Sequence, residues 1–237
     1  MFIAGMPVMK IGSLLIISDL HIGITKDIWD KGVRIPSQVK ATAARINALK
    51  RSTETAKLVM LGDVKHHIPN ISWQEEKEIP EFFSLLDFKK IILVKGNHDG
   101  RIERLVPGNV KVRKSYSCGK YAFTHGHRTI KTSKGIIVMG HNQAHVKFRD
   151  ELGASYVEPV WVKGPLKGPY KGKKLVMVPA FNELAGATLV NKDELIGPIA
   201  RHLDKKQAHC YLLDGTDLGT VSDLAIIVKQ VNNQEIL

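Results

Sequence analysis

Three short apolar segments of the chain each end in polar residues, and this repeated pattern constrains the fold more than any other feature. The segments are "SLLIISDLH" at 13–21, "KLVMLGD" at 57–63 and "KKIILVKGNHD" at 89–99. Continuous apolar runs of this length are typical of strands that are buried on both faces of a sheet. They predict a mostly parallel sheet whose polar residues emerge at its carboxyl edge, where ligands bind in such sheets.

Two segments between these runs have the periodicity of amphipathic helices. In "PSQVKATAARINALKR", residues 36–51, apolar residues recur every three or four positions behind a Pro-Ser start. The segment "EEKEIPEFFSLLDF" at 75–88 predicts another helix, which Pro80 could interrupt. Strands that alternate with helices in this way predict an α/β fold.

The second half of the chain is richer in segments that predict antiparallel strands. A hairpin that turns near Cys118 and Gly119 is expected within 110–127, and "KGIIVMGH" at 134–141 predicts a buried strand. Two further strands are expected in "AHCYLLDG" at 208–215 and "DLAIIVKQ" at 223–230. We therefore expect a second sheet packed on the first.

Composition limits the class of protein. A chain of 237 residues with 43% hydrophobic residues can bury a core, so we expect one folded domain over residues 1–237. The net charge of +12 suits a polyanionic partner such as DNA or RNA, although basic chains also occur without one. Two cysteines provide no disulfide framework, which favours the reducing cytoplasm. No apolar run is long enough to span a membrane, and no signal peptide is expected.

The polar residues at the strand ends form the candidate functional site. Taken singly they carry little information, because an aspartate after a strand is often a helix cap and a Gly-Asn pair is often a turn. Taken together, carboxylates and imidazoles at one sheet edge would stay unpaired unless a cation held them. These residues are Asp19, His21, Asp63, Asn97, His98, His125, His127 and His141.

This mixture of donors predicts the kind of metal. Imidazole together with oxygen ligands suits manganese, iron or zinc better than calcium or magnesium, which prefer oxygen alone. Two such ions can share a water, lower its pKa and hold a phosphate for in-line attack. We therefore expect two divalent transition-metal ions, with Mn²⁺ the first choice.

The segments "SDLHIG", "LGDVKH", "KGNHDG", "THGH" and "MGH" resemble, in order and approximate spacing, the motifs of the calcineurin-like metallophosphoesterase superfamily. The later "VMVPAFNEL" and "CYLLDG" are closer to the archaeal SbcD-related phosphoesterases. The resemblance implies a four-layer α/β/β/α sandwich with two mixed β-sheets. It also implies a phosphoesterase that hydrolyses phosphodiester bonds, for example those of nucleic acid or nucleotides.

The resemblance further implies a role for each residue. His98 would lie beside the phosphate as the catalytic residue, stabilising charge or protonating the leaving oxygen. His66, His127 and Asp99 would orient the ligands. The implied metal ligands are Asp19 and His21 at the first ion, Asp63 between the two ions, and Asn97, His125 and His141 at the second ion.

One motif departs from the superfamily pattern Gly-His-x-His. Read without a gap, Gln143 stands where the second histidine belongs; the alternative is a bulge that brings in His145. We favour Gln143, because "HVKFRD" alternates like a strand that begins at His145. An amide oxygen is a weaker ligand than imidazole, so the first site should be looser. The alternative function is therefore a catalytically impaired binding or scaffold protein with a weakened first metal site.

Overall fold

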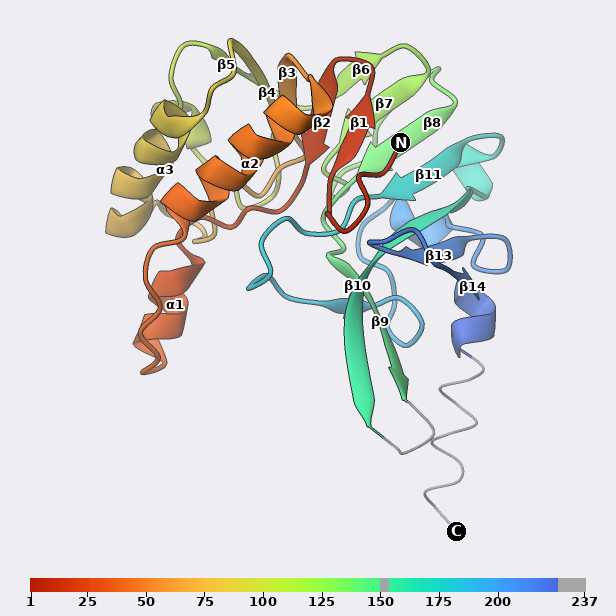
Figure 1. Ribbon diagram of the computed structural model, residues 1–237. Helices are drawn as coiled ribbons and strands as arrows, with labels where there is room; N and C mark the ends of the chain where they lie inside the picture. The colour runs from red at the N-terminus through yellow and green to blue at the C-terminus, as the bar shows by residue number, and fades with distance from the viewer. Residues whose placement is uncertain (150–153, 226–237) are drawn as a thin grey trace.

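The computed structural model describes residues 1–149 and 154–225, which form two β-sheets packed face to face (Figure 1). The first sheet has the order β1-β2-β3-β4-β5, in which β1 is antiparallel to β2 and the other pairs are parallel. The three apolar runs of the sequence are β2, β3 and β4. The strands of this sheet are β1 (Met9–Ile11), β2 (Leu14–Ile17), β3 (Lys57–Met60), β4 (Lys90–Val94) and β5 (Val110–Arg113).

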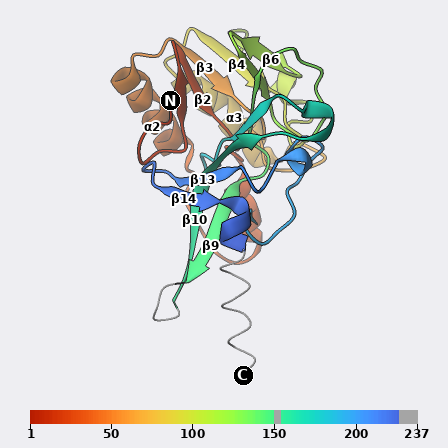
Figure 2. The ribbon, with the colours of Figure 1, turned by 90° about the vertical axis from the view of Figure 1, so that its right-hand side faces the viewer.

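The second sheet is also mixed, which confirms the expected architecture of two mixed sheets. Strand β8 is parallel to β7 and β11, whereas β10 is antiparallel to β9, β11 and β13. The strands β9 and β10 extend beyond the rest of the sheet (Figure 2). The strands are β6 (Tyr116–Cys118), β7 (Tyr121–Thr124), β8 (Ile136–Met139), β9 (Ala144–Arg149), β10 (Ser155–Pro165), β11 (Lys174–Met177), β12 (Thr188–Leu189), β13 (His209–Leu212) and β14 (Asp217–Thr220).

The predicted hairpin is present but shorter than the sequence indicated. Cys118 pairs with Tyr121 across β6 and β7, so the turn lies at Gly119 and Lys120 as expected. Residues 110–113, however, form β5 in the first sheet. Lys114 and Ser115 therefore carry the chain from one sheet to the other.

Both predicted helices are confirmed, and they cover the outer face of the first sheet (Figure 1). Helix α3 continues through Pro80, because burial of its apolar face, including Phe82, contributes more than the one lost hydrogen bond. None of the helices in the described ranges is long and apolar enough to cross a membrane. The helices are α1 (Ile24–Asp30), α2 (Val39–Thr53) and α3 (Trp73–Leu85).

The alternation of side chains along a strand divides the core into layers. Leu14 and Ile16 of β2 lie in the core between the sheets, where Trp161 of β10 is fully buried. Leu15 and Ile17 of the same strand pack against the helices. The three central strands β2, β3 and β4 are thus buried on both faces, as the apolar runs predicted, whereas the edge strand β5 exposes Lys111 and Arg113.

The outer face of the second sheet is covered by short turns rather than by long helices in the described residues. Two 3-10 helices, η2 (Gly168–Tyr170) and η3 (Ala200–His202), supply buried side chains to this layer. A third, η1 (Ile102–Arg104), follows β4. Residues 163–174, "KGPLKGPYKGKK", contain five lysines but contribute to this layer, because Leu166 and Tyr170 are buried in it.

The strand predicted within 223–230 is wrong for residues 223–225, which are helical, and residues 226–230 lie outside the described ranges. The reason is a helix cap. The backbone N–H of Asp223 donates to Thr220 Oγ1, and that hydroxyl donates to the Asp223 carboxylate. This reciprocal cap favours a helical turn over a strand at residues 223–225.

Asp99 ties together the loops that follow β3 and β4. It is fully buried. Its Oδ2 accepts hydrogen bonds from the backbone N–H groups of Asp63 and Gly96, both at 2.8 Å. Its Oδ1 accepts from Val64 at 2.9 Å and from Lys65 at 3.2 Å. One carboxylate therefore positions the backbone of the predicted bridging residue, Asp63, and of the two residues after it, together with the backbone of Gly96 in the neighbouring loop.

This arrangement predicts that Asp99→Asn destabilises the protein by about 3 kcal/mol, because an amide NH₂ would face backbone donors that need an acceptor. Asp87→Asn is the matched control, since Asp87 is an exposed partner of Lys50 and its loss should leave stability nearly unchanged. Urea unfolding measures both values. Equal stability of the two variants would show that Asp99 does not hold the loops.

Candidate metal centre

The seven residues predicted to bind metal come together at one edge of the paired sheets. Each follows the end of a strand, so the fold rather than proximity in sequence assembles them. Asp19 and His21 follow β2, Asp63 follows β3, Asn97 follows β4, His125 follows β7, and His141 and Gln143 follow β8.

His125 is the centre of the first group of donors. Its Nδ1 donates a hydrogen bond to the Leu61 carbonyl oxygen at 2.6 Å, because a carbonyl can only accept. In a neutral ring the Nε2 atom therefore carries a lone pair. Around this Nε2 lie Asn97 Oδ1 at 3.0 Å, Asp63 Oδ2 at 3.1 Å and His141 Nδ1 at 3.1 Å. Electron-pair donors this close together need a positive charge among them, either a proton on Nε2 or a metal ion.

The pKa values of the residues in this group also show that it needs positive charge. Burial lowers the pKa of His125, but the hydrogen bond and charge of Asp63 and the charge of Asp19 outweigh it and raise that pKa to about 9. Burial alone would raise the pKa of Asp63, yet contact with His125 lowers it. Burial and the charge of His125 lower the pKa of His141 to about 4. One positive charge on His125 thus satisfies the group, and a metal ion could take its place.

A second group of donors surrounds His21. Asp19 Oδ1 is buried and has no hydrogen-bond partner among the described residues. His21 Nε2 lies 4.0 Å from this oxygen and 3.9 Å from Asp63 Oδ2. Burial raises the pKa of Asp19 to about 6 and lowers the pKa of His21 to about 3. An unpartnered carboxylate oxygen beside a neutral imidazole suits a divalent cation.

The structure places Gln143, and not His145, against His21. The Gln143 side-chain amide lies 2.7 Å from His21 Nε2, and a half-turn of the amide would present its oxygen at the same place. His145 lies within β9, and its Nδ1 instead contacts the backbone carbonyl oxygen of Gln143 at 2.7 Å.

The backbone at these residues is strained. Seven non-glycine residues in the described part of the chain have positive φ, and five of them are predicted ligands. Such conformations cost about 1–3 kcal/mol each and persist at functional sites because the surrounding structure enforces them. The five are Asp19 (φ 53°), His21 (44°), Asp63 (51°), His141 (69°) and Gln143 (45°).

Glycines allow the loops to approach the ligands closely. A Cβ atom at Gly140 would lie 1.7 Å from Ser18 Oγ and 2.5 Å from Asp19 Oδ2. A Cβ atom at Gly96 would lie 2.1 Å from Asp63 Oδ1. Only glycine fits at either position without displacing a predicted ligand.

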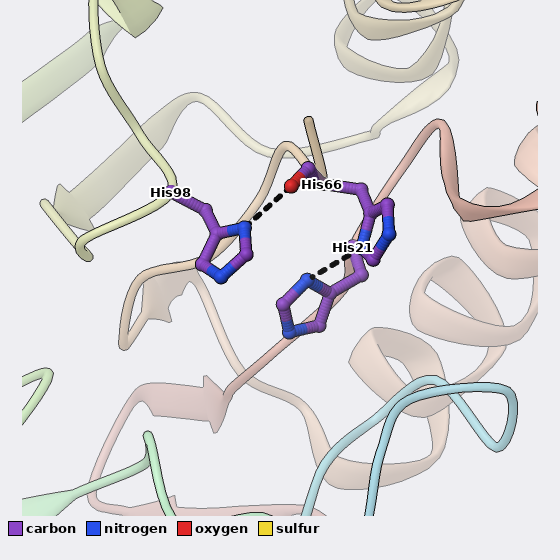
Figure 3. Close-up of side chains that lie close together, drawn as sticks. All are labelled: His21, His66 and His98. Atoms are coloured by element: carbon purple, nitrogen blue, oxygen red, sulfur yellow. Dashed lines mark hydrogen bonds between the residues drawn. The ribbon is translucent and has the colours of Figure 1, made fainter. Parts of the chain in front are cut away.

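Three histidines, His21, His66 and His98, lie close together at the site (Figure 3). His98 Nδ1 donates to the His66 carbonyl oxygen, and the His98 backbone N–H donates to Asp63 Oδ1 at 2.9 Å. His66 Nε2 lies 3.0 Å from Asp27 Oδ2, and its Nδ1 lies 3.2 Å from His21 Nδ1. Because the carboxylate accepts from Nε2, His66 Nδ1 accepts from His21 Nδ1. The His21 Nε2 lone pair then faces Asp63 and the predicted metal position.

Sequence reasoning missed Asp27. This residue belongs to α1, a helix of seven residues whose pattern is too short to be recognised by periodicity. The remaining predicted site residue, His127, lies outside both groups: its ring centroid is 5.4 Å from that of His125. Burial and the charges of His125 and Arg128 lower the pKa of His127 to about 4.

Comparison with known proteins gives the family and the fold. The sequence model described as "Calcineurin-like phosphoesterase" matches residues 12–202. No protein with a curated functional description matches the sequence. The structure is similar to the Pseudomonas putida nuclease MPE, with a TM-score of 0.56 and 19% identity over 87% of this chain and 88% of that one.

Two other solved structures are less similar to this one. A phosphoesterase from E. coli has a TM-score of 0.38 and 17% identity, covering 70% of this chain and 77% of that one. A novel archaeal phosphodiesterase has a TM-score of 0.37 and 15% identity, covering 70% of this chain and 83% of that one.

The family match extends over most of the chain and contains every strand end described above. The likeness to the Pseudomonas putida structure shows the fold. The motifs from Leu14 to His141 predicted this result. The chain belongs to the calcineurin-like phosphoesterase family.

Proposed function

We propose that this protein is a phosphoesterase that uses two divalent metal ions to hydrolyse phosphodiester bonds. The observation that carries the proposal is the convergence of Asp63, Asn97 and His141 on His125 Nε2, at 3.0–3.1 Å. The unpartnered Asp19 Oδ1 supports a second position on the other side of Asp63. Membership of the phosphoesterase family supports the class of reaction.

The donors suggest how two ions would be held. When bound, the ions would supply a water of lowered pKa and charge stabilisation for a phosphate. Nitrogen and oxygen donors in one site fit Mn²⁺, with iron and zinc as alternatives. The first ion would be held by Asp19, His21 and Gln143, the second by Asn97, His125 and His141, and Asp63 would contact both.

His98 is the proposed catalytic residue. Its backbone N–H and its Nδ1 are both engaged, with Asp63 Oδ1 and the His66 carbonyl oxygen. These two contacts fix the position of the ring and leave Nε2 for the substrate. When the ring is protonated, its Nε2–H can stabilise charge on the phosphate or give its proton to the leaving oxygen, which leaves a neutral imidazole with Nδ1–H still on the His66 carbonyl.

Gln143 favours a second candidate function, a binding or scaffold protein whose first metal site is too weak for catalysis. Its side-chain amide, and not an imidazole, contacts His21 at Nε2, the atom that faces the predicted metal position. An amide is the weaker ligand for a transition metal. Hydrolysis of a simple phosphodiester separates the two candidates.

The state of the two cysteines suggests the cellular environment of the protein. Cys118 and Cys210 are both free thiols, and burial raises the pKa of Cys210 to about 12, which makes it unreactive. Free cysteines fit a reducing compartment, so we keep the cytoplasm as the proposed location.

The catalytic proposal predicts that the protein hydrolyses bis(p-nitrophenyl) phosphate with Mn²⁺, and that His98→Ala lowers kcat by about 10²–10⁴. Metal content measured by mass spectrometry should stay the same, because His98 is not a proposed ligand. His67→Ala, which changes an exposed histidine next to His66, is the control and should keep full activity. No turnover with manganese, iron or zinc would favour the scaffold protein instead.

The ligand assignment predicts unequal metal affinities. In a calorimetric titration with Mn²⁺, one ion should bind more tightly than the other, and Gln143→His should tighten the weaker site because imidazole replaces an amide. His145→Ala should leave both affinities unchanged. Two equally tight sites that disappear in His145→Ala would show that the wrong residue was chosen.

The contact of Asp27 with His66 predicts a role in orienting His21. Removing it by Asp27→Asn or His66→Ala should weaken the first site by about 10–100-fold, because partners of metal-ligating histidines have effects of this size. Asp30→Asn, in the same helix but paired with Lys26 at the surface, is the control. A variant of Asp27 with unchanged Mn²⁺ affinity would contradict the assignment.

A further inference from the structure

Two grooves of similar size on the described surface differ in charge. One, of about 610 Å³, lies between α1, α2 and α3 and contains two lysines and two glutamates, Lys40, Lys77, Glu78 and Glu81. The other, of about 570 Å³, contains five cationic residues and a single acidic one. We call the second one the basic groove; its charged residues are Lys95, Glu103, Arg113, Lys114, Arg128 and Lys131.

Most of the positive charge in the basic groove is uncompensated. Glu103 Oε1 lies 2.6 Å from Lys95 Nζ, so these two charges neutralise each other. The other four cationic side chains are exposed or at the surface, and none of them forms an ion pair with a carboxylate in residues 1–149 or 154–225. Cations gathered in one groove repel each other and create a positive potential that attracts an anion.

The basic groove adjoins the group of donors around His125. Gly96 and Thr124 line it, and each directly precedes a predicted ligand, Asn97 and His125. His127 also lines the groove, with its ring 5.4 Å from the ring of His125. An anion in this groove therefore lies beside the place where the phosphate would react.

The fold holds the groove in place. Arg113 ends β5 and Lys114 follows it, while Arg128 and Lys131 lie in the segment after β7. The Lys95 backbone N–H donates to the Arg113 carbonyl oxygen at 2.8 Å. The cationic residues are thus fixed relative to the loop that carries Asn97.

We infer that the basic groove binds successive phosphate groups of a nucleic-acid strand and leads the strand to the metal centre. The inference rests on the proposed function and deepens it, because it names the class of phosphodiester. Four uncompensated cations match several phosphates, and their binding gains from the release of counterions. Among the described residues, no phenylalanine, tyrosine or tryptophan lines the groove, so contacts are to the backbone and are independent of base sequence.

The test is binding of a fluorescent single-stranded DNA oligonucleotide, followed by anisotropy at several salt concentrations in EDTA, where no hydrolysis occurs. Arg128→Gln/Lys131→Gln should weaken binding on the order of tenfold at about 0.1 M salt and reduce the slope of log K against log salt by about 1.4. Arg113→Gln/Lys114→Gln should have the same effect. For an RNA strand the losses should match, and for a DNA duplex the slope should fall by about 1.8.

Lys40→Gln/Lys77→Gln is the matched control, because it removes the same charge from the other groove. It should bind the oligonucleotide like the unaltered protein. Equal losses in the control and in both groove variants, or no binding by the unaltered protein, would overturn the inference. The measurement needs no turnover, so a protein that binds the strand through the groove but fails to hydrolyse any phosphodiester would contradict only the proposed function.

Discussion

The structure depends on a group of electron-pair donors that face one another at a buried sheet edge. Asp63, Asn97 and His141 all approach His125 Nε2 within about the length of a hydrogen bond, and Asp19 has a carboxylate oxygen with no partner in the described part of the chain. Such an arrangement is unfavourable unless positive charge compensates it. The metal-free protein supplies that charge by raising the pKa of His125. The proposed ions would supply it more completely.

The rest of the fold can be understood as the means of holding these donors together. Parallel strands bring their ends to one edge, and two sheets packed face to face bring a second set of ends beside the first. Asp99 fixes the loops after β3 and β4, and Gly140 lets the loop after β8 approach Asp19. Positive φ angles at five predicted ligands show that the surrounding core enforces conformations that these residues would otherwise avoid.

The sequence predicted those parts of the molecule that depend on local patterns. Apolar runs identified β2, β3 and β4, and with them Asp19, Asp63 and Asn97. It could not predict parts that depend on tertiary contacts. Asp27 lies in a short helix, and the cap formed by Thr220 and Asp223 starts a helical turn where the sequence predicts a strand.

The basic groove also depends on tertiary contacts and could not be predicted from the sequence. Its cationic residues lie in separate segments after β4, β5 and β7, so no charge cluster is visible in the sequence. The preference for Gln143 over His145 as a metal ligand stays a prediction, and it rests on the alternation of a strand that begins at His145. In the structure the side-chain amide of Gln143 contacts His21, while His145 contacts the backbone carbonyl oxygen of Gln143, the residue before β9.

The most direct test of the central claim is anomalous X-ray diffraction from a crystal of the protein soaked with Mn²⁺. The account predicts two anomalous peaks about 3.5–4 Å apart on either side of Asp63, one of them bounded by Asn97, His125 and His141. An empty site at saturating Mn²⁺ would contradict it. So would a single ion bound elsewhere, for example between His21, His66 and His98, whose nitrogen atoms also lie close enough together to hold a metal.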